Sequence, residues 1–205
     1  MSRTPPLEQA ELAIIGAGCA GLSLARQLVR TEKTSSIKAC LYGPVSPAAT
    51  NRHSWGFWAT QGLKEQTELA RQRWHKWQII TAERKVTQTA DSHPYCRLDS
   101  RDWLTHCLNI IDGNIQQEPD NLPTPGAKPV FDSRPPNVPD GAMLQHFKGV
   151  EIKAAQPCFS PDTAILMDFR CDQSRGIHFI YLLPYSPTEA LVESTMLSPK
   201  RQNDQ

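Results

Sequence analysis

The sequence predicts an α/β fold that begins with a βαβ unit and ends in an antiparallel β portion. The βαβ unit is indicated by the apolar run Leu12–Ile15, by a glycine-rich turn followed by apolar residues at helical spacing, and by a second strand-like run over 37–42. The antiparallel portion is indicated by strand-like segments at 164–169, 177–183 and 190–195. The polar turn between the last two segments predicts a hairpin.

The composition favours a cytoplasmic protein of one or two domains. The chain has 205 residues, of which 39% are hydrophobic, so it can build a core. Its net charge of 22 − 21 = +1 argues against a nucleic-acid binder, which usually carries a basic patch. No apolar stretch reaches the roughly 20 residues that a membrane span needs, and the first ten residues do not resemble a secretory signal. Six scattered cysteines without metal-ligand spacing predict reduced thiols and no metal site.

The middle of the chain predicts two helices and a connector. We expect a helix over 61–77, in which Trp74 and Trp77 form one packed face, and a second over 100–111 with Ser100 as its N-cap. Seven of the 17 prolines fall between 118 and 139, and proline is excluded from central strands and helix interiors. The expected domains are therefore 1–117 (nucleotide-binding), 118–139 (connector) and 140–205 (antiparallel β, substrate-binding).

A glycine-rich turn follows the first predicted strand and opens the first predicted helix. Its sequence GAGCAG satisfies G-x-G-x-x-G, the pattern of a Rossmann-like dinucleotide site. The first glycine permits the tight turn, the second lets the backbone approach a pyrophosphate, and the third allows close packing of helix on strand. Exposed N–H groups at the helix N-terminus attract phosphate. The expected cofactor-binding residues are Gly16, Ala17, Gly18, Ala20 and Gly21.

One part of that pattern is absent. A carboxylate should end the second strand and bind the adenosine ribose, but the sequence there is Cys40-Leu41-Tyr42-Gly43-Pro44. The hydroxyl of Tyr42 is a poorer acceptor than a carboxylate, so Tyr42→Glu is expected to tighten binding. No Arg or Lys follows to bind a 2′-phosphate, which argues against NADP.

Several segments together resemble the flavin-dependent lycopene cyclases of carotenoid biosynthesis. Besides the glycine turn, an aromatic segment is similar to the family's Arg-Thr-Trp-Cys-Phe-Trp motif, and the last third contains the largest similar block. The similar segments occur in family order, at residues 51–58, 130–135, 145–149, 166–170, 181–187 and 191–195.

The resemblance implies a fold like that of the flavoprotein monooxygenases, with an antiparallel sheet over the substrate. It implies FAD in its reduced form, for which NAD(P)H is a candidate reductant, and an isomerisation without net redox change. The implied substrate is lycopene or a similar ψ-ended carotenoid, whose ends are protonated and closed to β-rings. Such a lipophilic substrate implies peripheral contact with a membrane.

The resemblance also implies roles for individual residues. The family's acidic motif Phe-Leu-Glu-Glu-Thr aligns with residues 191–195, which makes Glu193 the candidate acid and puts Ser194 in place of the second carboxylate. The residues themselves offer Asp168, which follows three apolar residues, as a second candidate acid. An acid that protonates an alkene must keep its proton near neutral pH, and burial in apolar surroundings raises the pKa of a carboxyl group. Arg101 begins an Arg-x-x-Leu segment similar to one that lies near the flavin in related flavoproteins. We interpret Asp132-Ser133-Arg134 as a strand end with a salt bridge.

The chain departs from the family pattern by being short between Asp112 and Pro129 and after Ser198. Two alternatives therefore stay open beside a cyclase. One is a generic FAD- or NAD-dependent oxidoreductase, and the other is a non-catalytic remnant that binds a nucleotide or a carotenoid.

Overall fold

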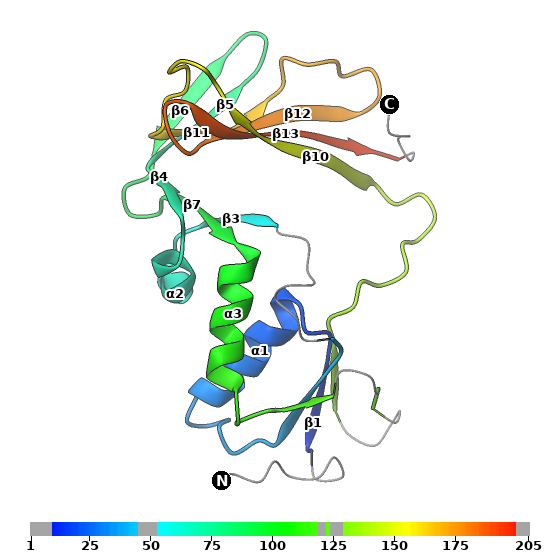
Figure 1. Cartoon of the computed structure of the whole chain (residues 1–205). Helices are drawn as coiled ribbons and strands as arrows, with labels where there is room; N and C mark the ends of the chain where they lie inside the picture. Colours follow the sequence, from blue (N-terminus) through cyan, green and yellow to red (C-terminus); the bar gives the residue numbers. More distant parts are fainter. Residues whose placement is uncertain (1–9, 45–52, 119–121, 124–128, 200–205) are drawn as a thin grey trace. The chain divides into compact units, whose positions relative to one another are not determined.

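The computed structural model describes residues 10–44, 53–118, 122–123 and 129–199, and divides the chain into two compact units (Figure 1). The first unit comprises residues 1–55 and 99–136, and the second comprises 56–98 and 137–205. Residues 56–98 thus belong to the second unit, although they lie within the nucleotide-binding part expected over 1–117. Asn51, Arg52 and parts of the expected connector lie outside the described residues. The functions assigned to the three expected domains stay predictions.

The first unit contains a parallel four-stranded sheet, which confirms the predicted βαβ unit. Its strand order is β8-β2-β1-β9, and all three neighbouring pairs are parallel. The two central strands are buried along their whole length, as expected of parallel strands that read as continuous apolar runs. The strands are β1 (Leu12–Ile15), β2 (Ala39–Tyr42), β8 (Gln116–Glu118) and β9 (Val130–Asp132).

Two helices of this unit pack against each other. They are α1 (Cys19–Arg30) and α3 (Ser100–Ile111). The indole N–H of Trp103 donates a hydrogen bond of 2.9 Å to the hydroxyl of Ser23, and the guanidinium of Arg26 lies 5.3 Å from the centre of the Trp103 ring. This contact fixes α3 on α1.

The N-cap of α3 differs from the predicted Ser100. Asp99 is the N-cap, and its carboxylate accepts a hydrogen bond of 3.0 Å from the backbone N–H of Arg101. Ser100 is the first helical residue, and its hydroxyl accepts a bond of 3.0 Å from the N–H of His53. Asp and Ser are both common N-cap residues, and the structure has Asp99 in that position.

The second unit is built on a six-stranded sheet of order β10-β13-β12-β11-β5-β6 and a three-stranded sheet of order β3-β7-β4. The predicted hairpin is confirmed, because β12 and β13 pair antiparallel along their length. β10, which the sequence analysis did not predict as a strand, pairs antiparallel with all of β13. The strands are β3 (Ser54–Trp58), β4 (Gln72–Trp74), β5 (Lys76–Ile80), β6 (Lys85–Thr89), β7 (Tyr95–Asp99), β10 (Leu144–Lys153), β11 (Thr163–Asp168), β12 (Ile177–Pro184) and β13 (Glu189–Ser198).

The predicted helix over 61–77 is wrong. Only a short turn, η2 (Gln61–Leu63), and one further turn, α2 (Lys64–Glu68), are helical, and β4 and β5 follow. Trp74 is fully buried and donates a hydrogen bond of 3.0 Å to the carbonyl of Pro184, whereas Trp77 pairs with Ala164 in β11. The tryptophan spacing matches a helix face, but sheet pairing outweighed it. Trp74 belongs to the core, as expected, and the partly buried Trp77 packs against it.

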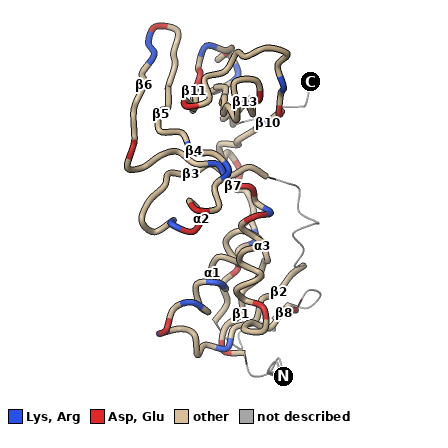
Figure 2. The backbone as a smooth tube through the Cα atoms, turned by 60° about the vertical axis from the view of Figure 1, so that its left-hand side comes forward, with Lys and Arg blue, Asp and Glu red and all other residues tan. Residues whose placement is uncertain are grey.

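Charged residues of both signs are spread along both units (Figure 2). Among the described residues, no helix combines the length and apolar character that crossing a membrane requires.

Candidate functional site

The turn after β1 has the geometry expected of its first glycine. Gly16 has φ +99°, a conformation that L side chains rarely adopt. Its N–H donates a bond of 2.8 Å to the carbonyl of Tyr42, and a Cβ at this position would overlap the hydroxyl of Ser133. That hydroxyl donates a hydrogen bond of 2.8 Å to the carbonyl of Ile15. Ser133, which directly follows β9 and was not predicted to belong to the turn, therefore holds the turn in place.

The second and third glycines differ in the space around them. A Cβ at Gly18 would meet no atom within 4 Å, so this position is open to a bound group. A Cβ at Gly21 would overlap the carbonyl oxygen of Gly16, so only glycine permits this approach of helix to turn. Ala17 is half-buried and Ala20 is exposed. The first turn of α1 contains no acidic residue, which leaves the helix N-terminus favourable to an anion.

The carboxyl ends of the parallel strands gather further polar groups beside this turn. Tyr42 ends β2, and burial is the main cause that raises the pKa of its phenol to about 12. Asp132 ends β9, where hydrogen bonds from the Arg134 side chain lower the pKa of its carboxyl to about 2. The nitrogens Nε and Nη2 of Arg134 lie 2.9 and 2.6 Å from the Asp132 carboxylate. The predicted salt bridge at this strand end is therefore confirmed.

Arg101 lies in the first turn of α3 and is itself exposed. Its backbone N–H is bonded to Asp99. Its expected role beside a flavin stays a prediction.

Glu193 lies in the middle of β13 and has one paired residue in each of the two neighbouring strands. It pairs with Tyr181 of β12 and with Gly149 of β10. The hydroxyl of Thr195 donates a hydrogen bond of 3.0 Å to Oε1 of Glu193, and Thr195 itself is fully buried. A Cβ at Gly149 would lie 3.4 Å from Oε2. Thr195 therefore holds one carboxylate oxygen, while Gly149 leaves space beside the other.

Aromatic rings of the second unit form a connected cluster. The ring centre of Trp58 lies 5.5 Å from that of Trp77 and 5.1 Å from that of Tyr95, and Tyr95 is stacked on Trp74 at 6.1 Å. A Cβ at Gly56 would overlap the hydroxyl of Tyr95, so this glycine makes room for the phenol.

This aromatic cluster lies within electrostatic reach of Glu193. Burial raises the pKa of Tyr95 to about 12, and Tyr181 and Glu193 contribute to the rise. Burial also raises the pKa of Tyr181, and the charge of Glu193 is again a contributing cause. The half-buried carboxyl group of Glu193 therefore lies near the phenols of Tyr95 and Tyr181.

Asp168 lies on the opposite face of the same sheet. It pairs with Ile180, whereas Glu193 pairs with the next residue, Tyr181, and consecutive strand residues point to opposite faces. Nε and Nη2 of Arg170 lie 2.9 and 2.7 Å from the Asp168 carboxylate, and these hydrogen bonds lower the pKa of its carboxyl. The structure therefore does not bring the two candidate acids together.

Ser194, which replaces the family's second carboxylate, faces away from Glu193 as its direct neighbour in the strand. Its hydroxyl shares a hydrogen bond of 2.9 Å with Nε2 of His178. The replacement of the family's second carboxylate by Ser194 therefore affects the face of the sheet opposite to Glu193.

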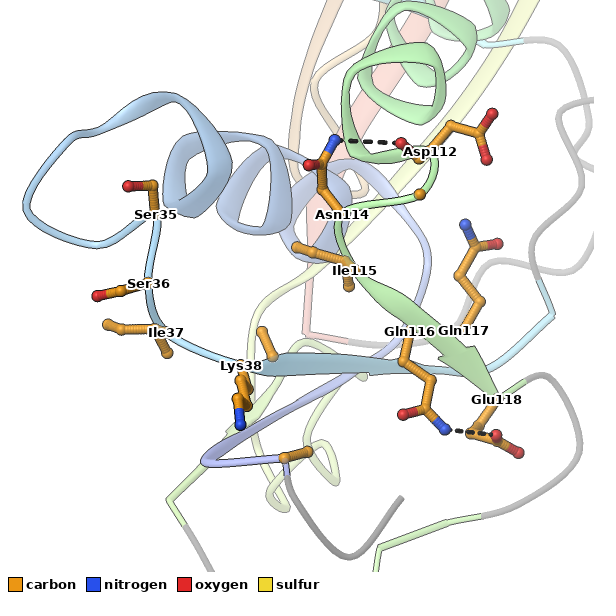
Figure 3. Close-up of a pocket in the computed structure, with 13 residues that line it drawn as sticks. Ser35, Ser36, Ile37, Lys38, Asp112, Asn114, Ile115, Gln116, Gln117 and Glu118 are labelled. Atoms are coloured by element: carbon orange, nitrogen blue, oxygen red, sulfur yellow. Dashed lines mark hydrogen bonds between the residues drawn. The ribbon is translucent and has the colours of Figure 1, made fainter. Parts of the chain in front are cut away.

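A cavity of about 550 Å³ lies in the first unit (Figure 3). It is bordered by residues 35–39, after α1, and by residues 112–118, after α3. None of the predicted site residues borders it, but Glu118 does. Within the described part of the chain, no group of three or more His, Cys, Asp or Glu side chains could hold a metal ion.

Sequence comparison identifies one family. The family described as "Lycopene cyclase protein" matches residues 11–111 and 118–204. The lycopene beta-cyclase of Pantoea ananas is 26% identical over 200 residues, which cover 90% of this chain and 51% of the relative. The lycopene beta-cyclase of Paracoccus sp. (strain N81106 / MBIC 01143) is 46% identical over 55 residues, which cover 27% of this chain and 14% of the relative. The chain thus spans about half the length of the Pantoea relative.

Solved structures with the same fold are distant in sequence. The halogenase PltM, solved with phloroglucinol and FAD, has a TM-score of 0.63 at 9% identity. The match covers 96% of this chain and 53% of the PltM chain. A geranylgeranyl bacteriochlorophyll reductase-like protein from Thermoplasma acidophilum has a TM-score of 0.61 at 10% identity, with 92% and 56% covered. These similarities show the fold of FAD-dependent monooxygenases and halogenases, as the sequence predicts.

Proposed function

The chain belongs to the lycopene cyclase family, and we propose that it takes part in the acid-initiated closure of the ψ-ends of lycopene, or of a similar carotenoid, to β-rings. The carotenoid substrate is inferred from the family and from the names of its relatives. The observation that carries the proposal is the setting of Glu193, whose carboxylate is held by Thr195 beside aromatic and apolar side chains.

Glu193 would act as the acid. Because the hydroxyl of Thr195 donates to Oε1, the proton of the acid form is carried by Oε2. Transfer of that proton to the terminal double bond forms a C–H bond and leaves a tertiary carbocation and a carboxylate. The neighbouring double bond would attack the cation and close the ring. The Glu193 carboxylate would then take up a proton from the ring cation, which restores both the alkene and the acid form of Glu193. The aromatic faces of Trp58, Trp77 and Tyr95 are suited to stabilise the cation.

Asp168 is the weaker candidate for this step. Its bonds to Arg170 favour the ionised carboxylate, which has no proton to give.

The turn over 16–21 would hold the pyrophosphate of FAD. The strained φ of Gly16, the open position at Gly18 and the acid-free N-terminus of α1 fit such a group. Reduced FAD would supply negative charge, or an alternative proton source, without net redox change, and NAD(P)H is the candidate reductant. Arg101 would lie beside this cofactor. Because the proposed substrate is lipophilic, the protein would bind peripherally to the cytoplasmic surface of a membrane.

A specific observation favours a second candidate, a non-catalytic remnant that binds a nucleotide or a carotenoid. That observation is the end of β2, where Tyr42 takes the position of the expected ribose-binding acid.

The decisive experiment expresses the chain in a lycopene-accumulating bacterial host and measures β-carotene, with Glu193→Gln as the test and Glu189→Gln as the control. Glu189 belongs to the same strand and is paired with Lys153 at 3.1 Å. If the parent forms no rings, the same variants are joined to the C-terminal region of a family member. We expect the parent and the Glu189 variant to form rings and the Glu193 variant to form none. Purified protein without flavin absorbance and without cyclisation in either form supports the remnant, and stoichiometric consumption of reductant supports an oxidoreductase.

A further inference from the structure

The end of β8 lies directly beside the end of β2. The two strands are parallel, and their register pairs Tyr42 with Glu118. The backbone N–H of Gly43 donates a hydrogen bond of 3.0 Å to the carbonyl of Glu118. Because Gly16 is in turn bonded to the carbonyl of Tyr42, the glycine turn, Tyr42 and Glu118 occupy neighbouring positions along one edge of the sheet.

The Glu118 side chain is half-buried and held in place. Nε2 of Gln116 donates a hydrogen bond of 3.0 Å to Oε1 of Glu118 (Figure 3). The two residues are on one face of the sheet with Tyr42. The charge of Glu118 contributes to the raised pKa of the Tyr42 phenol, for which burial is the main cause. The carboxylate is therefore close to the end of β2.

We propose that Glu118 is the ribose-binding acid of the nucleotide site, in place of the carboxylate that β2 lacks. Neighbouring strands are about 4.8 Å apart, so a carboxylate at the end of β8 is displaced by one strand spacing from the usual position. A carboxylate accepts hydrogen bonds from both ribose hydroxyls of an adenine nucleotide and repels a 2′-phosphate. The ligand class is thus an adenine nucleotide with an unmodified ribose, such as the ADP half of FAD.

This inference rests on the proposed nucleotide site at the glycine turn and changes one expectation from the sequence. Tyr42→Glu was expected to tighten binding. In the structure, that glutamate would be in register with Glu118, and two adjacent carboxylates repel each other. Tyr42→Glu alone should therefore weaken the binding of an adenine nucleotide. The same substitution should restore that binding only in a chain in which Glu118 has been replaced by glutamine.

The test measures binding of ADP and of 2′-deoxy-ADP to the full chain by calorimetry. The parent should prefer ADP by about tenfold or more, because a hydrogen bond to a charged group is lost with the 2′-hydroxyl. Glu118→Gln should abolish the preference and weaken ADP binding. Tyr42→Glu added to this variant should restore both. The control is Glu11→Gln, an exposed acid just before β1 and therefore at the amino ends of the parallel strands, and it should match the parent.

The outcomes separate the inference from the proposed site. ADP binding that Gly18→Val abolishes but Glu118→Gln leaves unchanged, with the preference for the 2′-hydroxyl intact, overturns the role of Glu118 alone. A folded parent that binds neither ADP nor FAD overturns both the nucleotide site and the role of Glu118. Far-UV circular dichroism of each variant establishes that it is folded.

Discussion

Thr195 donates its hydroxyl hydrogen to Oε1 of Glu193, two positions earlier in the same strand. The alternation of a β-strand puts both side chains on one face, and the burial of Thr195 keeps its hydroxyl away from competing water. The second oxygen of Glu193 lies beside Gly149, where a side chain is missing. One carboxylate oxygen is therefore fixed and the other is accessible.

Glu193→Gln should reduce cyclisation by at least about 10²-fold, the lower end of what general acid catalysis contributes. The amide retains the size and the hydrogen bond from Thr195 but has no ionisable proton. The measurement is β-carotene formed in a lycopene-accumulating host, normalised to the amount of folded protein. Full activity of the variant would assign the proton to another group.

Thr195→Val should reduce cyclisation by roughly tenfold, because the isosteric change removes the donor that orients Oε1 and a hydrogen bond to a charged group is worth about 1.5–3 kcal/mol. Thr195→Ser retains the hydroxyl and should recover most of the activity. The measurement compares kcat of the Val variant with kcat of the Ser variant at saturating substrate. Equal rates for Val and Ser would mean that the hydroxyl does not position Glu193.

Gly149→Ala should lower activity with little loss of stability. The added methyl would lie 3.4 Å from Oε2 of Glu193 and 3.2 Å from a terminal methyl of Leu191, whose flexible end can shift. The control is Gly62→Ala, where a Cβ meets no atom within 4 Å. Labelling of Glu193 by dicyclohexylcarbodiimide, followed by peptide mass spectrometry, should slow only in the Gly149 variant. Unchanged labelling there would show that Oε2 is approached from elsewhere.

Glu193→Gln should also lower the pKa values of Tyr95 and Tyr181. Burial is the main cause of both raised values and persists in the variant, but the negative charge that disfavours each phenolate is removed. Tyrosinate absorbance during an alkaline titration measures the change. Glu189→Gln should leave the titration as in the parent, and an identical curve for the Glu193 variant would place its carboxylate out of reach of both phenols.

The raised pKa values of Tyr42 and Tyr95 predict how the free energy of unfolding depends on pH. The pKa values of Tyr42 and Tyr95 rise from 10.0 to about 12 on folding. A folded-state pKa above the unfolded one stabilises the fold fully below pH 10, and this contribution is lost as the pH rises through 12. The free energy of unfolding, measured with urea, should therefore fall between these pH values. Tyr95→Phe should make that fall shallower, and an unchanged slope would count against the burial of its phenol.

Gly18→Val should affect nucleotide binding, whereas Gly21→Val should affect the stability of the fold. Gly18 has open space and an extended backbone (φ −87°), so valine should leave folding intact and block nucleotide binding. At Gly21 the side chain would overlap the Gly16 carbonyl, and overpacking of this kind costs about 1–3 kcal/mol or more. Thermal unfolding combined with ADP calorimetry distinguishes the two. Retained binding in a folded Gly18 variant would remove the turn from the site.

The sequence by itself determined the parts that depend on neighbours along the chain. The apolar run of β1, the glycine turn and α1 form as predicted, because the turn needs a positive φ that glycine supplies and the strand needs apolar residues on both faces. The hairpin of β12 and β13 is likewise encoded by two apolar segments around a polar turn. The choice of Glu193 as the candidate acid follows from the resemblance of residues 191–195 to the family motif and stays a prediction.

Only the tertiary structure decided the parts that depend on distant pairing. Trp74 and Trp77 have helical spacing, yet pairing of β5 with β11 makes the second of them a strand residue. The two candidate acids separated because register places Asp168 beside Ile180 and Glu193 beside Tyr181. Glu118 came to lie beside Tyr42 because parallel strands unite residues far apart in the chain. No local pattern carries such information, since hydrogen bonding between strands constrains which residues meet without requiring particular side chains in either strand.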